Sequence, residues 1–300
     1  MVPALFFFLI SDKISCMNME TYFHRQRNGI LITLEAAKKL TKYGRKHFKF
    51  RKMDNYSDFI AVGTTNSNLV SEKPEDFVSG DINNFKLVTT GGSTGKSKKI
   101  YYDMSEQIKL VLPDLLNNII KLSNKPIYLY HDEGGTTHSV YEINFPKLFS
   151  HVTVAKYNTV EEAVGSIKNA DLIYIEDTVS SFRRLLYSIE KLVEKNKKIS
   201  KSLKGKVILL ELGGEPITLK ELNDFYVRIK KIFDTGPDIA MTYGLVETQD
   251  ASVYVFHQWD NVLRYRVFDN KFVEVLDVET NKPILGKIGE IVITPMYWKK

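Results

Sequence analysis

From Phe85 onward, short apolar runs alternate with longer stretches whose apolar residues have helical spacing. The strand candidates are Lys86–Thr89, Ile127–Tyr130, Val152–Tyr157, Leu172–Ile175, Val207–Leu212, Ile239–Thr242, Ser252–Phe256, Phe272–Asp277 and Ile288–Thr294. The helix candidates between them are Ser105–Leu122, Val160–Asn169, Ser180–Asn196 and Leu219–Phe233. A chain that alternates strand and helix in this way predicts an α/β fold, a sheet with helices packed on it. After Asp250 strands and turns dominate, which predicts a β-rich subdomain at 251–300.

The first part of the chain, residues 1–84, has a more mixed pattern. Helical spacing over Leu34–Tyr43 predicts a helix with Thr33 as its N-cap and Gly44 as its stop. The apolar run Val2–Ile10 is far shorter than the roughly 20 residues that span a bilayer. No basic residue precedes this run, so the pattern favours an incorrectly assigned start codon or a buried strand over a targeting signal. We expect no membrane segment.

Composition limits the class of protein. The chain has 300 residues, of which 43% are hydrophobic and 26% charged, so it can fill a core and is not disordered. Its 42 basic and 36 acidic residues give a net charge of +6, which attracts anions mildly but does not indicate nucleic-acid binding. The single cysteine, Cys16, excludes an internal disulfide and predicts a cytoplasmic protein.

Seven lysines lie within Lys191–Lys206 without interleaved aromatic residues, which favours a solvated helix end over a nucleic-acid site.

One loop carries the clearest chemical signal. The segment 89–99 follows a strand candidate and reads TTGGSTGKSKK. Glycines let backbone N–H groups approach an anion, and hydroxyl and ammonium groups add donors and positive charge. The loop therefore predicts polyphosphate binding, with a plain surface turn as the alternative. The Walker A pattern is only nearly met, because Thr90 stands where its first glycine is required.

The same loop resembles the phosphate loop of the acyl-adenylate-forming superfamily, which includes acyl-CoA synthetases and luciferases. Its pattern, Thr/Ser-Gly-Ser/Thr-Thr-Gly-x-Pro-Lys, is matched by residues 92–98, GSTGKSK. Ser97 replaces the usual proline, and Gly91 replaces the usual serine.

Two further motifs follow in the order that this superfamily requires. Residues 213–217, GGEPI, resemble its Gly-Gly-Glu-Pro-Leu turn beside the adenine. Residues 241–248, MTYGLVET, resemble its Tyr-Gly-x-Thr-Glu motif, with Val246 in place of the threonine. The segment 273–294 looks like the phenylacetate–CoA ligase branch, and acyl-protein synthetases of the bioluminescence type are also similar. Each motif is weak alone, but three in order are specific.

The resemblance implies a function and assigns residues to it. It implies activation of a small carboxylic acid by ATP and Mg²⁺, with release of pyrophosphate and transfer to a thiol such as CoA or to a carrier protein. It makes 85–250 a nucleotide-binding α/β core within the large N-terminal domain. The implied catalytic residues are Thr94, Lys98 and Glu247, with Glu247 as the Mg²⁺ ligand. The implied nucleotide-binding residues are Gly92, Ser93, Thr94, Gly95, Lys96, Gly213, Gly214, Glu215, Pro216, Tyr243 and Gly244.

His131 directly follows the strand candidate Ile127–Tyr130. In the superfamily, residues after this strand shape the acyl pocket, so His131 is implied as a pocket residue that faces the carboxylate. Asp132, Glu133 and His138 lie close by in sequence, but their spacing matches no known metal-ligand pattern.

The resemblance covers about residues 85–294. The ribose-binding aspartate and the lysine of the mobile C-terminal domain lie beyond this region in the superfamily, which predicts a truncated enzyme or a separate C-terminal partner. Asp269 imitates that aspartate but precedes Gly289, so its order is wrong. Three hypotheses stay open: an adenylate-forming ligase, a catalytically weak nucleotide- or acyl-binding homologue, and a P-loop NTPase.

Overall fold

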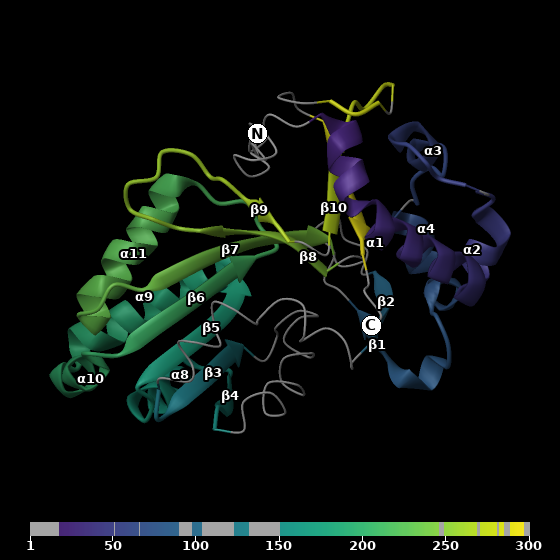
Figure 1. Ribbon diagram of the computed structural model, residues 1–300. Helices are drawn as coiled ribbons and strands as arrows, with labels where there is room; N and C mark the ends of the chain where they lie inside the picture. Colours follow the sequence, from purple (N-terminus) through teal and green to yellow (C-terminus); the bar gives the residue numbers. More distant parts are fainter. Residues whose placement is uncertain are drawn as a thin grey trace. The chain divides into compact units, whose positions relative to one another are not determined.

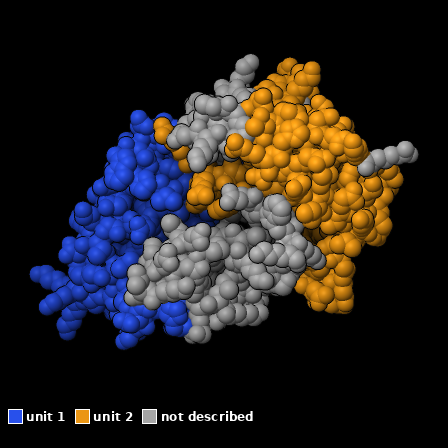
Figure 2. Space-filling model, in the orientation of Figure 1, with its two compact units in different colours: residues 1–4, 105–243, 254–263 blue, residues 5–104, 244–253, 264–300 orange. Residues whose placement is uncertain are grey.

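The computed structural model describes residues 18–50, 52–65, 67–89, 98–103, 123–131, 151–245, 249–268, 271–280, 282–284 and 289–296. The chain divides into two compact units, which Figure 2 colours separately. Unit 1 comprises residues 1–4, 105–243 and 254–263, and unit 2 comprises residues 5–104, 244–253 and 264–300. Each unit is therefore assembled from segments that are distant in the sequence.

Unit 1 is built on parallel strands. They are β3 (Pro126–His131), β4 (Thr153–Tyr157), β5 (Leu172–Thr178), β6 (Val207–Gly213) and β7 (Asp238–Leu245), which continues past the unit boundary. They lie side by side in the order β4-β3-β5-β6-β7, and every neighbouring pair is parallel (Figure 1). Strands in a covered parallel sheet are buried on both faces, which explains why they stand out in the sequence as continuous apolar runs.

Four helices lie in the described part of unit 1. They are α8 (Val160–Lys168), α9 (Val179–Lys195), α10 (Lys197–Leu203) and α11 (Leu219–Phe233). Each begins after an N-cap residue whose side-chain oxygen accepts a hydrogen bond from the first turn: Thr159, Thr178, Asn196 and Thr218. Helix α8 packs on β3 and β4, and α9 packs on β5 (Figure 1). The strands and helices expected here are confirmed; the helix expected over Ser105–Leu122 lies outside the described residues.

The described part of unit 2 combines one long helix and several short ones with antiparallel strand pairs. Its helices are α1 (Met19–Leu40), α2 (Lys42–His47), α3 (Tyr56–Ile60) and α4 (Ser67–Glu72), with 3₁₀ turns at Pro74–Phe77 and Ile82–Asn84. The strands are β1 (Phe85–Thr89), β2 (Lys99–Asp103), β8 (Gln249–Val255), β9 (Arg266–Val267), β10 (Lys271–Leu276) and β11 (Glu290–Pro295), of which β8 continues past the unit boundary. Antiparallel pairs form between β1 and β2, β8 and β9, and β10 and β11. The expected β-rich character after Asp250 is confirmed in the described part.

The N-terminal helix differs from its prediction. Helix α1 begins after the N-cap Asn18, so Thr33 lies within it, and Gly44 lies inside α2 rather than ending a helix. A Cβ atom at Gly44 would stand 2.1 Å from the carbonyl oxygen of Ala37, so this glycine permits close packing of α2 on the end of α1. The Thr33 and Gly44 predictions were wrong because local signals cannot distinguish a cap or a stop from a tertiary packing requirement.

The core of unit 2 is an aromatic cluster shared by α1, α3 and β10. Phe23 and Phe272 are fully buried, and the ring of Phe23 lies against those of Tyr56, Phe59 and Phe272. Tyr22 stacks on Phe272 with ring centroids 4.6 Å apart. These contacts join residues almost 250 positions apart. Within the described residues, no helix combines the length and apolar character needed to cross a membrane.

Candidate functional site

Polar side chains line up where the parallel strands of unit 1 end. Tyr157 on β4 stands directly opposite His131 on β3. Strands β3 and β5 pair in a register that, continued by two residues, sets His131 beside Asp177. The two side chains point to the same face of the sheet, because neighbouring paired residues share a face and side chains alternate along each strand. This is the carboxyl edge of the sheet. In the sheet, β4 lies on one side of β3, and β5, which follows β4 in the chain, lies on the other side of β3. Such a reversal of strand order marks the usual ligand crevice of an open α/β sheet.

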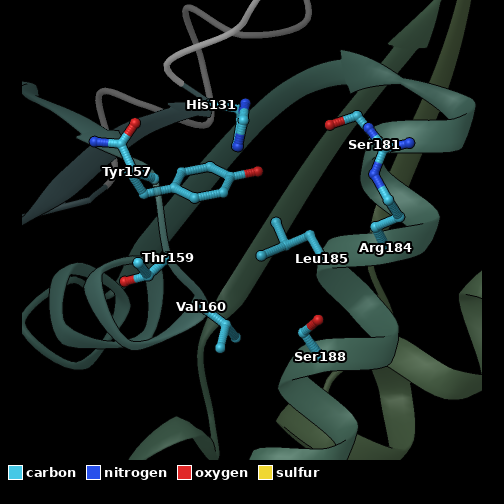
Figure 3. A pocket seen from close by; sticks show the side chains of 9 residues that line it. His131, Tyr157, Thr159, Val160, Ser181, Arg184, Leu185 and Ser188 are labelled. Atoms are coloured by element: carbon cyan, nitrogen blue, oxygen red, sulfur yellow. The ribbon is translucent and has the colours of Figure 1, made fainter.

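A pocket of about 630 Å³ opens at this point. Its lining residues are His131, Tyr157, Asn158, Thr159, Val160, Ser181, Arg184, Leu185 and Ser188 (Figure 3). The four residues from α9 are spaced so that they share one face of that helix. The pocket volume lies within the range of small-molecule sites, and its lining is mostly polar.

Asp177 is buried beside this pocket and is electrostatically coupled to it. Burial raises the pKa of Asp177 to about 6, while the Thr178 N–H group, the Ser181 side chain and the charges of His131 and Arg184 act in the opposite direction. Burial and the neighbouring Asp177 raise the pKa of the Tyr157 hydroxyl above its usual value. The rings of His131 and Tyr157 meet edge to face with centroids 5.1 Å apart.

Two buried polar atoms in this group are unsatisfied. Neither the Tyr157 hydroxyl nor Asp177 Oδ2 has a hydrogen-bond partner of acceptable geometry among the described residues, although the two groups influence each other's pKa. Tyr157 is only 4% exposed. Burying a polar atom without a partner costs about 1–3 kcal/mol, so such atoms call for an explanation, and a site that binds a ligand provides one.

The Gly-Gly-Glu turn after β6 has an observed structural role. Gly214 has φ of +73°, a conformation that favours glycine, and a Cβ atom at Gly213 would stand 2.8 Å from Thr242 Oγ1. The Glu215 carboxylate accepts hydrogen bonds from the Ser180 backbone N–H at 2.6 Å and from the Ser180 hydroxyl at 2.7 Å. Glu215 therefore ties this turn to the first turn of α9, the helix that carries Arg184.

The remaining described residues of the predicted nucleotide site lie at the same edge of unit 1 or just beyond it. Tyr243, near the end of β7, is half-buried, and burial raises its pKa. Gly214, Pro216 and Gly244 are exposed. A glycine leaves the backbone open, because no side chain stands on it.

Several predicted site residues cannot be placed. Gly92, Ser93, Thr94, Gly95, Lys96 and Glu247 lie outside the described residues. Lys98 is described: it is partly buried and directly precedes β2 in unit 2. The structure brings His131 together with Tyr157, Asp177 and Arg184. Among the residues that the structure describes, no cluster of three or more His, Cys, Asp or Glu side chains could hold a metal ion.

Sequence reasoning missed Tyr157, Asp177, Ser181 and Arg184. The first two carried a usable signal, because each is a polar-headed residue near the carboxyl end of an apolar strand, where ligands of α/β sheets bind. Nothing in the sequence distinguished Arg184 from the adjacent Arg183.

No protein-family model matches the sequence, and no curated protein matches it. Solved structures do share its fold. An open conformation of 2-hydroxyisobutyryl-CoA ligase in complex with 2-HIB-AMP and CoA matches with a TM-score of 0.62 and 12% identity, over 90% of this chain and 60% of that one. The ATP-bound RpMatB-BxBclM chimera B1 matches with a TM-score of 0.50 and 15% identity, over 73% of this chain and 41% of that one.

ATP-bound MatB from Rhodopseudomonas palustris has a TM-score of 0.48 and 15% identity, with the same coverage as the chimera. This chain thus spans between 41% and 60% of the length of these structures. Identities this low establish the fold alone. The α/β fold implied by the resemblance to adenylate-forming enzymes is confirmed.

Proposed function

We propose that the protein activates a small carboxylic acid with ATP, forming an acyl-adenylate and releasing pyrophosphate. The observation that carries this proposal is the ordered set of three motifs in a chain with the fold of solved acyl-CoA ligases. The carboxyl edge of the unit 1 sheet supports it, since the Gly213–Gly214 turn, Tyr243 and the polar pocket all lie there.

The chemistry requires positioning and charge neutralisation. The carboxylate attacks the α-phosphate of ATP, so the protein must hold two anions in line and stabilise the charge that develops. Exposed backbone at Gly214 and Gly244 would accept the adenine, with Tyr243 as its aromatic neighbour. Lys98 would neutralise phosphate charge, and the hydroxyl and amide groups of the 92–96 segment would bind phosphate oxygens.

Two further groups take part in this proposal. Mg²⁺ would be held by Glu247, because a carboxylate is a preferred ligand of this hard cation, and would neutralise phosphate charge when bound. The acyl group would then pass to a thiol such as CoA or to a carrier protein, as in the phenylacetate–CoA ligase branch that residues 273–294 resemble. We further propose that the protein acts in the cytoplasm.

The decisive experiment is acid-dependent exchange of labelled pyrophosphate into ATP by the full chain, measured with a panel of carboxylic acids. Exchange that depends on both the acid and Mg²⁺ supports the proposal. Release of ADP without any acid would instead indicate an NTPase. Nucleotide binding with neither reaction would indicate a binding homologue.

The predicted phosphate and metal ligands can be tested separately. We expect Lys98→Ala and Glu247→Ala each to weaken Mg·ATP binding by about tenfold, because a charge-assisted contact contributes roughly 1.5–3 kcal/mol. Isothermal titration calorimetry measures the change in Kd. Lys52→Ala and Glu279→Ala serve as controls, since both of these side chains are exposed elsewhere on the chain. Unchanged affinity in both test variants would overturn the site assignment.

A further inference from the structure

The outer side of unit 1 exposes three large apolar side chains, on α9, on α11 and in the loop between β8 and β9. Tyr187 on α9 is 57% exposed, Val227 on α11 is 51% exposed and Trp259 in the loop is 81% exposed. A single exposed apolar residue is ordinary, but several gathered on one face mark an interaction surface. We call the outer side of the two helices, together with this loop, the α9–α11 face.

Ion pairs between the two helices place Tyr187 beside α11. Arg183 of α9 pairs with Glu221 of α11, and Glu190 of α9 pairs with Arg228 of α11. Tyr187 lies four residues after Arg183 and three residues before Glu190, so these three side chains share one side of α9. Because Tyr187 is exposed, it lies at the outer rim of the contact between the helices.

The loop between β8 and β9 lies against α11 (Figure 1). The ring of Phe256, at the start of the loop, contacts the ring of Tyr226 on α11 with centroids 6.1 Å apart. Trp259 follows three residues later and stacks on His257, with ring centroids 4.9 Å apart. The Asp260 carboxylate accepts a hydrogen bond from the His257 backbone N–H at 3.1 Å. The loop thus holds an exposed indole ring in place near the middle of α11.

The charges of the α9–α11 face favour an anionic partner. Every acidic residue of the two helices is held in an ion pair: Glu190, Glu194, Glu221 and Asp224. The lysines of α11 are all exposed: Lys220, Lys230 and Lys231. Among the described residues, no ion pair involves any of these three lysines. Asp234, just beyond α11, contributes a single opposing charge. The face therefore combines free positive charge with exposed apolar side chains.

We propose that the α9–α11 face docks on the headgroup region of an anionic phospholipid bilayer. Tryptophan and tyrosine favour a membrane–water interface, because each has an apolar ring and a polar group. Each lysine near such a surface adds attraction to the anionic lipid headgroups. A peripheral contact of this kind needs no membrane-spanning helix.

The type of cation favours a lipid surface over a nucleic acid. Arginine is the residue typical of two-point phosphate and base recognition, and Arg183 and Arg228 already bind carboxylates. The free cations of α11 are lysines, whose flexible point charges suit a diffuse layer of headgroups. An acidic protein surface would fit the same charges, and the experiment distinguishes it from lipid.

The test is cosedimentation of the full chain with lipid vesicles, without nucleotide or acid. Phosphatidylcholine vesicles are compared with vesicles that contain both phosphatidylcholine and phosphatidylglycerol. We expect binding to the mixed vesicles to be at least about tenfold tighter, and the double variant Lys230→Gln/Lys231→Gln to lose about tenfold of it. The control Lys46→Gln/Lys49→Gln removes the same charge from exposed positions of unit 2 and should leave binding nearly unchanged.

Tryptophan fluorescence tests whether the contact includes apolar burial. The chain has two tryptophans, so Trp298→Phe leaves Trp259 as its only one. Its emission should shift to shorter wavelength on mixed vesicles, because the indole ring leaves water. Trp259→Ala should weaken binding by about tenfold, since it removes most of the apolar area that the contact buries. Trp259 is 81% exposed, so this replacement should leave the fold intact, which circular dichroism checks.

Four results would overturn the proposal: equal binding to both kinds of vesicle, no binding to either, unshifted emission, or equal losses in the two lysine double variants. Binding of soluble polyglutamate through the same lysines, without binding to vesicles, would assign the face to an acidic protein instead. Because the vesicle assay uses neither ATP nor acid, a failure of acid activation would leave its outcome unchanged.

Discussion

At the scale of single residues, unit 2 buries a carboxyl beside its aromatic core. Glu274 on β10 is only 4% exposed and accepts a hydrogen bond from the Tyr56 hydroxyl. Burial raises the pKa of Glu274 to about 7, although the bond from Tyr56 opposes the rise. The folded chain therefore retains this proton at pH values where the unfolded chain has lost it.

This predicts that stability falls as pH increases. Between the ordinary pKa of 4.5 and the folded value of about 7, the folded state binds more protons, so the free energy of unfolding decreases with pH. The full effect is roughly 3 kcal/mol. Glu274→Gln keeps the Tyr56 bond without the charge and should flatten this dependence. Urea denaturation at pH 5 and pH 8.5 measures it, with the exposed Glu279→Gln as control; identical pH profiles for Glu274→Gln and the parent chain would contradict the prediction.

At the scale of elements, the turn after β6 and helix α9 form a connected structure. Glu215 fixes the turn to Ser180 at the start of α9, and Arg228 of α11 makes a bidentate ion pair with Glu190 near the other end of α9. Helix α9 is thereby held at both ends, which fixes the helix that presents Arg184 to the pocket. Precise placement of such a side chain needs this kind of support.

Two glycines allow a matched test of the turn. Gly214 has a positive φ, so Gly214→Ala should destabilise the chain by about 1–2 kcal/mol. Gly165 lies within α8 with open space around its Cα, so Gly165→Ala should stabilise it by about 0.5–1 kcal/mol. Denaturant titrations give both values. Equal effects of the two substitutions would show that backbone conformation is not what requires Gly214.

At the scale of the whole molecule, the chain carries an excess of positive charge. The net charge of +6 attracts anions over distances that salt screens. Some lysines of the 191–206 segment serve the fold instead: Lys204 donates to the Lys231 carbonyl oxygen and Lys206 to that of Lys168. We therefore attribute the electrostatic attraction of anions to the chain as a whole rather than to the 191–206 segment.

The affinity for Mg·ATP should accordingly fall by a few-fold when NaCl is raised from about 0.05 to 0.5 M, because screening weakens long-range attraction. Calorimetry at the two salt concentrations measures the fall. Adenosine, which carries no charge, is the control and should bind with little change. A salt-independent affinity for Mg·ATP would show that the net charge contributes nothing to binding.

The amino-acid sequence by itself determined the α/β fold and the order of its motifs. Short-range residue patterns were enough to predict these elements, because buried parallel strands need continuous apolar runs and helices need periodic apolar faces with capping residues. Thus β5, β6, α8 and α11 were found close to their observed bounds. The superfamily resemblance likewise depended only on short local segments.

Only the tertiary structure decided the full length of α1, the role of Gly44 and the composition of the pocket. His131, Tyr157 and Arg184 come from different elements, and strand order and helix packing bring them together. Glu215 shows the same limit, since its partner Ser180 lies 35 residues earlier. Burial and long-range contacts set these properties, and neither leaves a periodic signal in the local sequence.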